Sequence, residues 1–480
     1  MKNLDLPKIW PVACHTDQVG PGSTFVAVKG HATDGLQFVA LALQKGATKI
    51  VVDQLAVTDE MTCLAKSYAA QLVGVENPRA ALSTLSAQAW GYPARKLKII
   101  GITGTKGKTT SVYALRHVLA TAGKSVAMLT GVENMIGAQK FTANLTTPHP
   151  DYLQMFLAQC VQVGIEYVVM EVSAQALSLN RVDDVLFTGV IFTNQELEHS
   201  EFYASMEQYF AAKCAIFNLL HSAAVVVLNL DDAWVSKILQ NNLILSQHQI
   251  VTFGRTGVAD YRLALAEQNL LAGLEFTLQS QNGAETFSYK SAQLYGIFNA
   301  YNLAGVVLCA KQLGIAHDKI VAAVSSFISA PGRLEIYKLP NGAQGVVDYA
   351  HTPSSFDNVL SLLRQQTKHL IVIFGAGGGR DPIKRPIMGE IATKLCDVVI
   401  LTNDNPRNED AQTIIQHIMG SQHPQKFLVE LDRAKAIALA YQLSKSGSII
   451  VLLGKGPDEY QIIGNQKYFF SDRQQLLSCI

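Results

Sequence analysis

The sequence predicts an α/β protein of three domains built on parallel sheets. The chain has 480 residues, and a domain usually takes about 150, so roughly three domains are expected. Short apolar runs alternate with helical patterns through the middle and last parts of the chain. This alternation is typical of parallel sheets that are covered on both faces. We expect a small N-terminal α/β domain over 1–95, a central parallel-sheet domain over 96–330 and a Rossmann-like α/β domain over 331–480.

The two expected boundaries contain Pro and Gly, which interrupt regular structure. The first, Gly91 to Lys96, follows an alanine-rich helical pattern at 78–90 and precedes an apolar run. The second, Ala330 to Arg333, lies between a helical pattern and another strand. Both stretches are therefore expected to be joints.

The expected strands are continuous apolar runs. They lie at 97–102, 167–170, 185–192 and 224–228 in the central domain and at 345–347, 371–374, 398–401 and 449–453 in the last one. Parallel sheets bind ligands at the carboxyl ends of their strands. Functional side chains are therefore expected directly after these runs.

Composition excludes several classes of protein. Hydrophobic residues make up 49% of the chain and charged residues 16%, which is too apolar for a disordered chain. The net charge of +1 argues against a protein built mainly to hold nucleic acid or an acidic membrane surface. No signal core and no membrane-length apolar stretch occur. Seven widely spaced cysteines without a CxxC fit a reducing compartment. We expect a cytoplasmic protein, a monomer, with no nucleic-acid partner and no membrane span.

A glycine-rich loop follows the first central strand. It comprises Gly104, Thr105, Lys106, Gly107, Lys108, Thr109 and Thr110 and leads into a helical pattern. Such a loop cradles phosphates with its backbone N–H groups and with the N-terminus of the helix. Lys108 would reach the β- and γ-phosphates, and Thr109 would ligate Mg²⁺. Ile102 replaces the first glycine of the strict pattern, so an ordinary glycine turn is the alternative. The Gly-Lys-Thr-Thr sequence between a strand and a helix favours nucleotide binding over such a turn.

Three further residues have side chains that could act in a metal or phosphate site, but the sequence pattern around each one does not decide its role. Glu171 ends an apolar strand, where it would be a magnesium ligand, a helix-capping residue or a solvated carboxylate. His199 follows the strand at 185–192, and a lone histidine is more often structural than ligating. Lys213 lies on an amphipathic helical pattern, and the pattern by itself favours a solvated lysine.

The last domain places polar residues after four of its strands. These are Asp348 to Pro353, Gly375 to Asp381, Asp404 to Arg407, and Gly454 to Gly456. Gly, Pro, Asn and Asp also form ordinary turns. Arg380 and Arg407 are less easily explained as turn residues, and we expect them to converge on one crevice that binds a carboxylate.

Together these motifs resemble the Mur ligases of peptidoglycan synthesis, from about residue 15 to the C-terminus. The resemblance rests on Gly104 to Thr110, Thr146-Thr147-Pro148, Glu171-Val172-Ser173, Arg181, Thr193-Asn194, His199, Lys213, Asn229 to Asp232, Gly296 to Asn299, Gly332-Arg333, Asp348 to Pro353, Lys384-Arg385-Pro386, Asp404 to Arg407 and Gly454 to Gly456. So many ordered matches are more specific than any single loop.

The resemblance implies an ATP- and Mg²⁺-dependent amide ligase. It would add meso-2,6-diaminopimelate to a UDP-muramoyl dipeptide through an acyl phosphate, with a central P-loop ATPase domain. The implied ATP contacts are the loop at 104–110, Asn299, Arg333 and Asp348. The implied UDP-substrate contacts are Thr16, His31, Thr146, Thr147, Ser173 and Arg181. The implied diaminopimelate contacts are Arg380, Asp404, Asn405, Pro406, Arg407, Gly454 and Asp458. The implied metal ligands are Thr109, Glu171, His199 and carbamylated Lys213, and the implied catalytic residues are Lys108, His199 and Lys213.

Two alternatives stay open. Another ligase of the superfamily would add lysine, a dipeptide or folate glutamate, but Arg407 suits the distal carboxylate of diaminopimelate and would repel a lysine ammonium. A degenerate binding protein would explain the departures from the family pattern at Ala174, Gln175 and Asp458. The departures at His15-Thr16-Asp17 and Lys106 suggest a divergent member of the family. Five intact residues argue against a degenerate protein: Lys108, Thr109, Glu171, His199 and Lys213.

Overall fold

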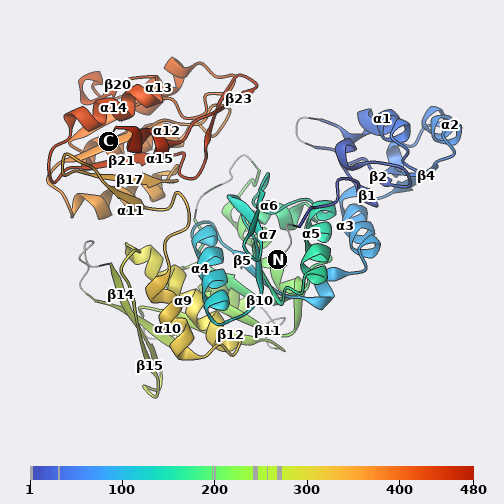
Figure 1. The fold of residues 1–480 in the computed structure, drawn as a ribbon, viewed down its shortest axis with the longest axis horizontal. Helices are drawn as coiled ribbons and strands as arrows, with labels where there is room; N and C mark the ends of the chain where they lie inside the picture. The colour runs from blue at the N-terminus through green and yellow to red at the C-terminus, as the bar shows by residue number, and fades with distance from the viewer. Residues whose placement is uncertain are drawn as a thin grey trace. The chain divides into compact units, whose positions relative to one another are not determined.

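The protein is described from a computed structural model. The structure describes residues 4–30, 33–196, 198, 202–241, 247–256, 258–266 and 273–479. The chain divides into two compact units. The first comprises residues 1–264, 276–289 and 300–325, and the second comprises 265–275, 290–299 and 326–480. Figure 1 shows the α/β layering within each unit.

The first unit begins with a four-stranded parallel sheet. Its strands, in spatial order, are β1 (Val12–Ala13), β2 (Thr24–Val26), β3 (Lys49–Asp53) and β4 (Gln71–Val75). Its helices are α1 (Val39–Gln44), α2 (Asp59–Ser67) and α3 (Pro78–Ala89). Helix α3 starts where it does because the Asn77 side chain accepts from the N–H groups of Arg79 and Ala80, with Pro78 at the first helical position. Separate apolar clusters cover the two faces of this sheet.

The rest of the first unit surrounds an eleven-stranded sheet. Its spatial order is β15 (Thr286–Ser291), β14 (Leu274–Ser280), β13 (Tyr261–Leu265), β12 (Gln249–Gly254), β11 (Leu220–Asn229), β10 (Phe187–Phe192), β5 (Lys98–Thr103), β9 (Tyr167–Glu171), β6 (Val126–Leu129), β7 (Glu133–Ile136) and β8 (Gln139–Thr142). The strands from β12 to β6 pair in parallel. Their carboxyl ends therefore lie at one edge, where β5, β9 and β10 deliver their following residues side by side.

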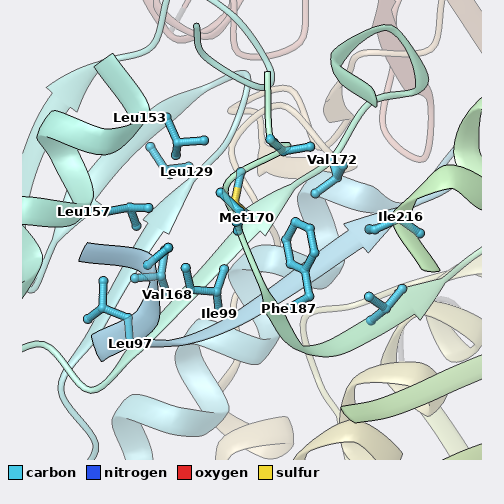
Figure 2. Packing of buried hydrophobic residues seen from close by; sticks show 14 of the residues in the cluster. Leu97, Ile99, Leu129, Leu153, Leu157, Val168, Met170, Val172, Phe187 and Ile216 are labelled. Carbon is cyan, nitrogen blue, oxygen red and sulfur yellow. The ribbon is translucent and has the colours of Figure 1, made fainter. Parts of the chain in front are cut away.

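Helices and a large apolar cluster cover this sheet. The helices are α4 (Lys108–Thr121), α5 (Pro150–Gln162), α6 (Ala174–Ser178), α7 (Met206–Cys214), α8 (Ser236–Asn241), α9 (Ile297–Gln312) and α10 (His317–Ser326). Figure 2 shows side chains of β5, β9 and α5 interdigitating in the core, among them Ile99, Val168 and Leu153, which are fully buried. Burial on both faces explains why these strands are apolar throughout.

The second unit contains a six-stranded sheet with the order β16 (Glu335–Lys338), β17 (Gln344–Asp348), β21 (Ile449–Leu453), β18 (Leu370–Phe374), β19 (Val398–Leu401) and β20 (Leu428–Val429). Only β16 is antiparallel to its neighbour. A hairpin of β22 (Tyr460–Ile463) and β23 (Gln466–Phe469) follows. The helices are α11 (Pro353–Arg364), α12 (Lys384–Leu395), α13 (Ala411–Met419), α14 (Arg433–Leu443) and α15 (Asp472–Ser478). Two apolar clusters lie in this unit.

The predicted α/β class with parallel sheets is confirmed. Within the described part of the chain, no helix combines the length and the apolar character that crossing a membrane would need.

Candidate active site

The glycine-rich loop is shaped by two close backbone approaches. Gly104 has φ +136°, and a Cβ there would lie 2.0 Å from Thr193 Oγ1. Gly107 has φ +84°, and a Cβ there would lie 2.1 Å from Asn302 Oδ1. Neither position has room for a side chain, and left-handed backbone disfavours one as well. The loop thus packs directly onto the end of β10 and onto α9.

Residues after β10 hold the loop from outside. Thr105 N–H donates to the Asn194 carbonyl (3.0 Å), and Lys106 N–H donates to Asn194 Oδ1 (2.8 Å). The Thr193 hydroxyl donates to the Lys106 carbonyl (2.7 Å). These bonds fix the loop so that it turns directly into the N-terminus of α4, where the helix dipole favours an anion.

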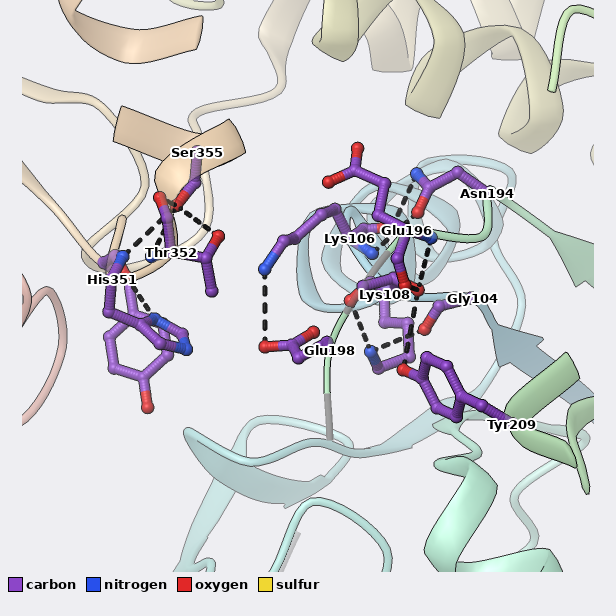
Figure 3. A network of polar contacts seen from close by, with 12 residues as sticks. Gly104, Lys106, Lys108, Asn194, Glu196, Glu198, Tyr209, His351, Thr352 and Ser355 are labelled. Atoms are coloured by element: carbon purple, nitrogen blue, oxygen red, sulfur yellow. Dashed lines mark hydrogen bonds and ion pairs between the residues drawn. The ribbon is translucent and has the colours of Figure 1, made fainter. Parts of the chain in front are cut away.

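Two lysines of the loop point to different partners, as Figure 3 shows. Lys108 Nζ donates back to the carbonyls of Gly104 (2.8 Å) and Thr105 (2.9 Å). Lys106 Nζ lies 3.4 Å from Glu198 Oε1. The loop therefore carries two positive charges, and the second is balanced by a carboxylate within the same unit.

Glu171 is a buried carboxylate joined to the loop. It is 2% exposed, and it ends β9 as the apolar run predicts. The Thr109 hydroxyl donates to Glu171 Oε1 (2.9 Å), and Gly131 N–H donates to the same atom (3.2 Å). Two hard oxygens thus meet at the start of α4, which is the donor chemistry that Mg²⁺ prefers.

The predicted metal ligands fall into two groups. Thr109, Glu171 and Lys213 are described, and His199 lies outside the described residues. Among the residues that the structure describes, no group of three His, Cys, Asp or Glu side chains is placed to hold a metal ion. The expected metal set therefore stays a prediction.

Lys213, near the end of α7, is buried and is 1% exposed. The solvated lysine that its sequence pattern favoured is therefore wrong, because side chains from three other positions close over the amine. Nζ donates to Thr105 Oγ1 (3.1 Å) and to Gln195 Oε1, and it lies 3.2 Å from the centre of the Tyr209 ring.

Burial changes the chemistry of this amine. Loss of solvation, followed by the nearby positive charge of Lys108, lowers the pKa of Lys213 to about 6, although Glu198 and Asp232 oppose the shift. An amine with that pKa is largely uncharged at neutral pH. It can therefore act as a nucleophile toward an electrophile such as CO₂.

The predicted UDP-substrate residues of this unit lie together beside Glu171. The Thr147 hydroxyl donates to the Glu171 carbonyl (3.0 Å) and accepts from Ser173 N–H (3.1 Å). Arg181 Nη1 donates to the Thr147 carbonyl (2.9 Å). Thr146 lies against Gly131, where a Cβ would come within 2.9 Å of Thr146 Oγ1.

The other two predicted UDP-substrate residues belong to the N-terminal sheet region. Thr16 begins a short 3-10 helix, and its carbonyl accepts from Lys45 Nζ (2.7 Å). His31 lies outside the described residues. The structure therefore describes one of these two positions, and a role for either in uridine binding stays a prediction.

Arg79 and His149 lie near Arg181, and the sequence analysis missed both of them. Burial first, then the charge of Arg79, lowers the pKa of Arg181. Burial first, then the charge of Arg181, lowers the pKa of His149. Such mutual repulsion is relieved by an anion, so the cluster suits a negatively charged ligand. Arg79 and His149 stand at the starts of α3 and α5, and no local pattern marks them.

In the second unit, Asp348 at the end of β17 is buried and fixed by backbone donors. Leu334 N–H donates to Oδ2 (2.9 Å) and Ala350 N–H to Oδ1 (2.7 Å). Burial raises the pKa of Asp348, and the charge of Arg333 opposes the rise. The Arg333 guanidinium stacks over the Tyr349 ring at 4.5 Å. Asn299, also expected at the nucleotide, is buried and donates to the Tyr295 carbonyl (2.8 Å).

The two arginines expected to bind a carboxylate are near each other. A Cβ on Gly377 would lie 3.1 Å from Arg407 Nη1 and 3.5 Å from Arg380 Cγ. Burial first, then the charge of Arg380, lowers the pKa of Arg407. Arg407 has φ +53°, a left-handed conformation that non-glycine residues rarely adopt. Its Nη1 also donates to the Gly378 carbonyl (2.8 Å).

The remaining predicted diaminopimelate residues line the adjoining strand ends. A Cβ on Gly454 would lie 2.5 Å from Asp404 Oδ2, so Gly454 lets this carboxylate approach the end of β21. Asn405 Oδ1 accepts from Ile462 N–H (2.9 Å), and the Pro406 carbonyl packs against Gly378. Burial raises the pKa of Asp458.

Two buried arginines hold these strand-end loops. Arg385 lies in a motif that carries the resemblance but was given no role from the sequence, and Arg433 was not singled out at all. Arg385 binds both oxygens of Glu409 and the Gly377 carbonyl, and Gly379 N–H donates to Glu409. The Arg385 bonds lower the pKa of Glu409 to about 2.

The second arginine, Arg433, is fully buried with Asp472. Its guanidinium also donates to the carbonyls of Asn403 (3.3 Å) and Leu453 (3.1 Å), which close β19 and β21. Its pairing partner is 39 positions away in the chain, so no local signal reveals the pair.

The chain belongs to the Mur ligase family. Residues 102–310 match the Mur ligase middle domain, and residues 332–456 match the glutamate ligase domain of Mur ligases. A relative from Clostridium perfringens, named UDP-N-acetylmuramoyl-L-alanyl-D-glutamate--2,6-diaminopimelate ligase, is 35% identical over 481 residues, which cover 99% of this chain and 95% of the relative.

Two further proteins carry the same name. The relative from Synechococcus elongatus is 36% identical over 458 residues, covering 95% of this chain and 90% of its own. A solved structure superposes with a TM-score of 0.66 at 29% identity and covers 98% of this chain and 94% of its own. The likeness therefore extends over nearly the whole length of each chain.

Proposed function

We propose that the protein is an ATP-dependent ligase that joins meso-2,6-diaminopimelate to UDP-N-acetylmuramoyl-L-alanyl-D-glutamate. The observation that carries this proposal is the near-full-length likeness to ligases that bear that name. The geometry agrees with it. A phosphate loop, a buried carboxylate and a buried amine occur in the first unit, and a pair of neighbouring arginines occurs in the second.

The reaction begins on the first unit with ATP on the loop at 104–110. The γ-phosphoryl group passes to the glutamyl carboxylate of the dipeptide. The bond between the γ-phosphorus and the bridging oxygen breaks, and that oxygen leaves as part of ADP. Lys108 turns from the loop carbonyls toward the phosphates and neutralises charge that spreads over the transferring oxygens. Thr109 and Glu171 would hold Mg²⁺, which would supply further positive charge when bound.

The amide bond forms by attack on the acyl phosphate. The uncharged amine of diaminopimelate attacks the acyl carbon, the bond to the phosphate oxygen breaks, and inorganic phosphate leaves with the electron pair. The amine loses one proton in this step. Arg79 and Arg181 supply the positive surroundings that suit the anionic UDP-substrate, and His149 lies beside them.

The amino-acid choice rests on the second unit. Arg380 and Arg407 flank Gly377, and a pair of guanidinium groups suits a carboxylate. Diaminopimelate carries a carboxylate at its distal end, where lysine has none. The same charges disfavour a lysine ammonium.

Lys213 is proposed to carry a carbamate. The buried amine has its pKa lowered to about 6, which leaves it reactive toward dissolved CO₂. The resulting anion would add oxygen donors to those of Thr109 and Glu171. The cytoplasmic location and the monomeric state stay predictions.

Phosphate release tests the proposal. The purified protein is mixed with ATP, Mg²⁺ and the UDP-muramoyl dipeptide, and the amine is meso-diaminopimelate, L-lysine, L-ornithine or D-alanyl-D-alanine. We expect phosphate release and a new product mass with diaminopimelate alone. Turnover with lysine would retain the reaction and overturn the amino-acid choice. ATP binding without turnover for any amine would overturn the enzyme and favour a binding protein.

A further inference from the structure

Gln195 lies next to the buried amine of Lys213. It follows Thr193 and Asn194 at the end of β10 and is 4% exposed. Its backbone N–H donates to Asp232 Oδ2 (2.8 Å), which fixes the residue at the strand end. Its side-chain oxygen accepts from Lys213 Nζ.

The amide nitrogen of Gln195 is unaccounted for. Among the described residues, Nε2 is buried and has no hydrogen-bond partner. A buried donor without a partner costs roughly 1–3 kcal/mol, so its presence calls for an acceptor. Lys213 Nζ is not that acceptor, because it donates to the oxygen of the same amide and makes no hydrogen bond with Nε2.

We propose that Gln195 is a positioning residue for the carbamate of Lys213, with Nε2 donating to a carbamate oxygen. The inference rests on the proposed modification of Lys213. In that step the lone pair of Nζ attacks the carbon of dissolved CO₂, a new N–C bond forms, and one C=O bond pair moves onto oxygen. The nitrogen then loses one proton to water. Its remaining N–H is available to Gln195 Oε1 or to Thr105 Oγ1, which both contact Nζ already.

The neutral amide suits this role better than its acidic or apolar counterparts. One end of the amide accepts a hydrogen bond and the other donates one, so both the N–H and the oxygen of a carbamate find a partner. A glutamate would repel the carbamate anion at this distance. A methionine would fill the space and offer no donor.

The modification itself provides the readout. The full-length protein is equilibrated with ¹³C-bicarbonate over a range of concentrations, and the carbamate carbon is followed by ¹³C NMR. Wild type, Gln195→Met, Gln195→Glu and Lys213→Met are compared. Gln208→Met serves as the control, because Gln208 is an exposed glutamine on the same helix as Lys213. Thermal unfolding verifies that each variant is folded. Two variants of Gln195 are made so that the test remains possible if one of them does not fold.

We expect a carbamate signal in wild type and in Gln208→Met, and none in Lys213→Met. Gln195→Met should need at least about tenfold more bicarbonate for half-occupancy, because a hydrogen bond to a charged group is lost. Gln195→Glu should need still more. Ligase activity of Gln195→Met should recover as bicarbonate rises, which a merely structural defect would not do.

The two proposals fail in different ways. A wild-type signal that persists at the same bicarbonate concentration in both Gln195 variants overturns the role of Gln195 and leaves the carbamate intact. A wild type without any signal overturns the carbamate, and the role of Gln195 falls with it.

Discussion

At the scale of single residues, Lys213 makes the stability of the protein depend on pH. Its pKa falls from the ordinary 10.5 to about 6 on folding. Between these values the unfolded chain holds a proton that the folded chain lacks, so the free energy of unfolding rises with pH. The rise is at most about 1.4 kcal/mol per pH unit. Lys213→Met removes this term and should stabilise the protein more at pH 7 than at pH 9.

Urea unfolding of wild type and Lys213→Met from pH 7 to pH 9 tests this, in buffers freed of CO₂. The two free energies should converge as pH rises. Added bicarbonate should stabilise wild type alone, because a modification confined to the folded state shifts the equilibrium toward it. A difference that stays constant with pH would contradict the buried, uncharged amine.

Substitutions of Arg407 can distinguish its backbone strain from its role in binding the substrate. With φ at +53°, a residue with a Cβ is disfavoured by roughly 1–2 kcal/mol compared with glycine. Arg407→Gly should therefore be more stable than Arg407→Ala by about 1 kcal/mol, the reverse of the usual order. Both variants should lose at least about a hundredfold in kcat/KM for diaminopimelate, since they lack the guanidinium.

The pair of variants contains its own control, because neither side chain can bind a carboxylate. Urea unfolding gives the stability difference, and steady-state kinetics give the substrate dependence. An Arg407→Ala variant as stable as Arg407→Gly would refute the strain. Undiminished use of diaminopimelate in either would refute the binding role.

What the sequence could predict at this scale depended on distance along the chain. Glu171 and Asp348 end apolar runs, so their places at strand ends could be predicted. The burial of Lys213 could not, since it is produced by Thr105, Gln195 and Tyr209. Tyr209 lies four positions before Lys213 on α7, but Thr105 and Gln195 lie on other segments that meet this helix only in the folded protein. The pattern of the helix alone favoured a solvated side chain.

At the scale of elements, the phosphate loop depends on packing as much as on backbone freedom. Gly104 has φ +136°, and an added Cβ would lie 2.0 Å from Thr193 Oγ1. Gly104→Ala should therefore push the loop off the end of β10 and weaken ATP binding by at least about a hundredfold. Binding of a non-hydrolysable ATP analogue, followed by calorimetry, measures this loss.

Gly123 is a matched control for that substitution. It also has a positive φ, of +80°, but a Cβ there would meet nothing within 4 Å. Gly123→Ala should cost only the backbone strain, roughly 1–2 kcal/mol of stability, and leave nucleotide affinity unchanged. Equal losses of affinity in the two variants would show that steric contact with β10 does not matter.

Strands were predictable where both faces are buried. The runs at 398–401 and 449–453 coincide with β19 and β21. Strands β13 and β14 escaped the sequence analysis because buried and exposed residues alternate along them. Such alternation in a short segment is a weaker signal than a continuous apolar run.

At the scale of the whole molecule, Pro and Gly at 330–333 predict a boundary between the central and the last domain. The limits of the three expected domains stay predictions. The structure divides the chain into two compact units with separate apolar clusters. Segments 265–275 and 290–299 belong to the second unit although they precede it in sequence. The composition of these two segments does not reveal that they belong to the second unit, because their assignment depends on the surfaces that they contact.

Separate cores predict separate unfolding, because each unit buries its own apolar side chains. Arg433 and Asp472 form a fully buried pair in the second unit, and Arg433→Met would leave the carboxylate without its partner. Removal of one member of a buried pair costs about 3–5 kcal/mol. Phe156→Ala removes a fully buried ring from the first unit at a similar cost of about 3–5 kcal/mol. In scanning calorimetry of the full chain, each variant should lower a different one of two transitions. A single transition that both variants shift alike would mean that the two units unfold as one.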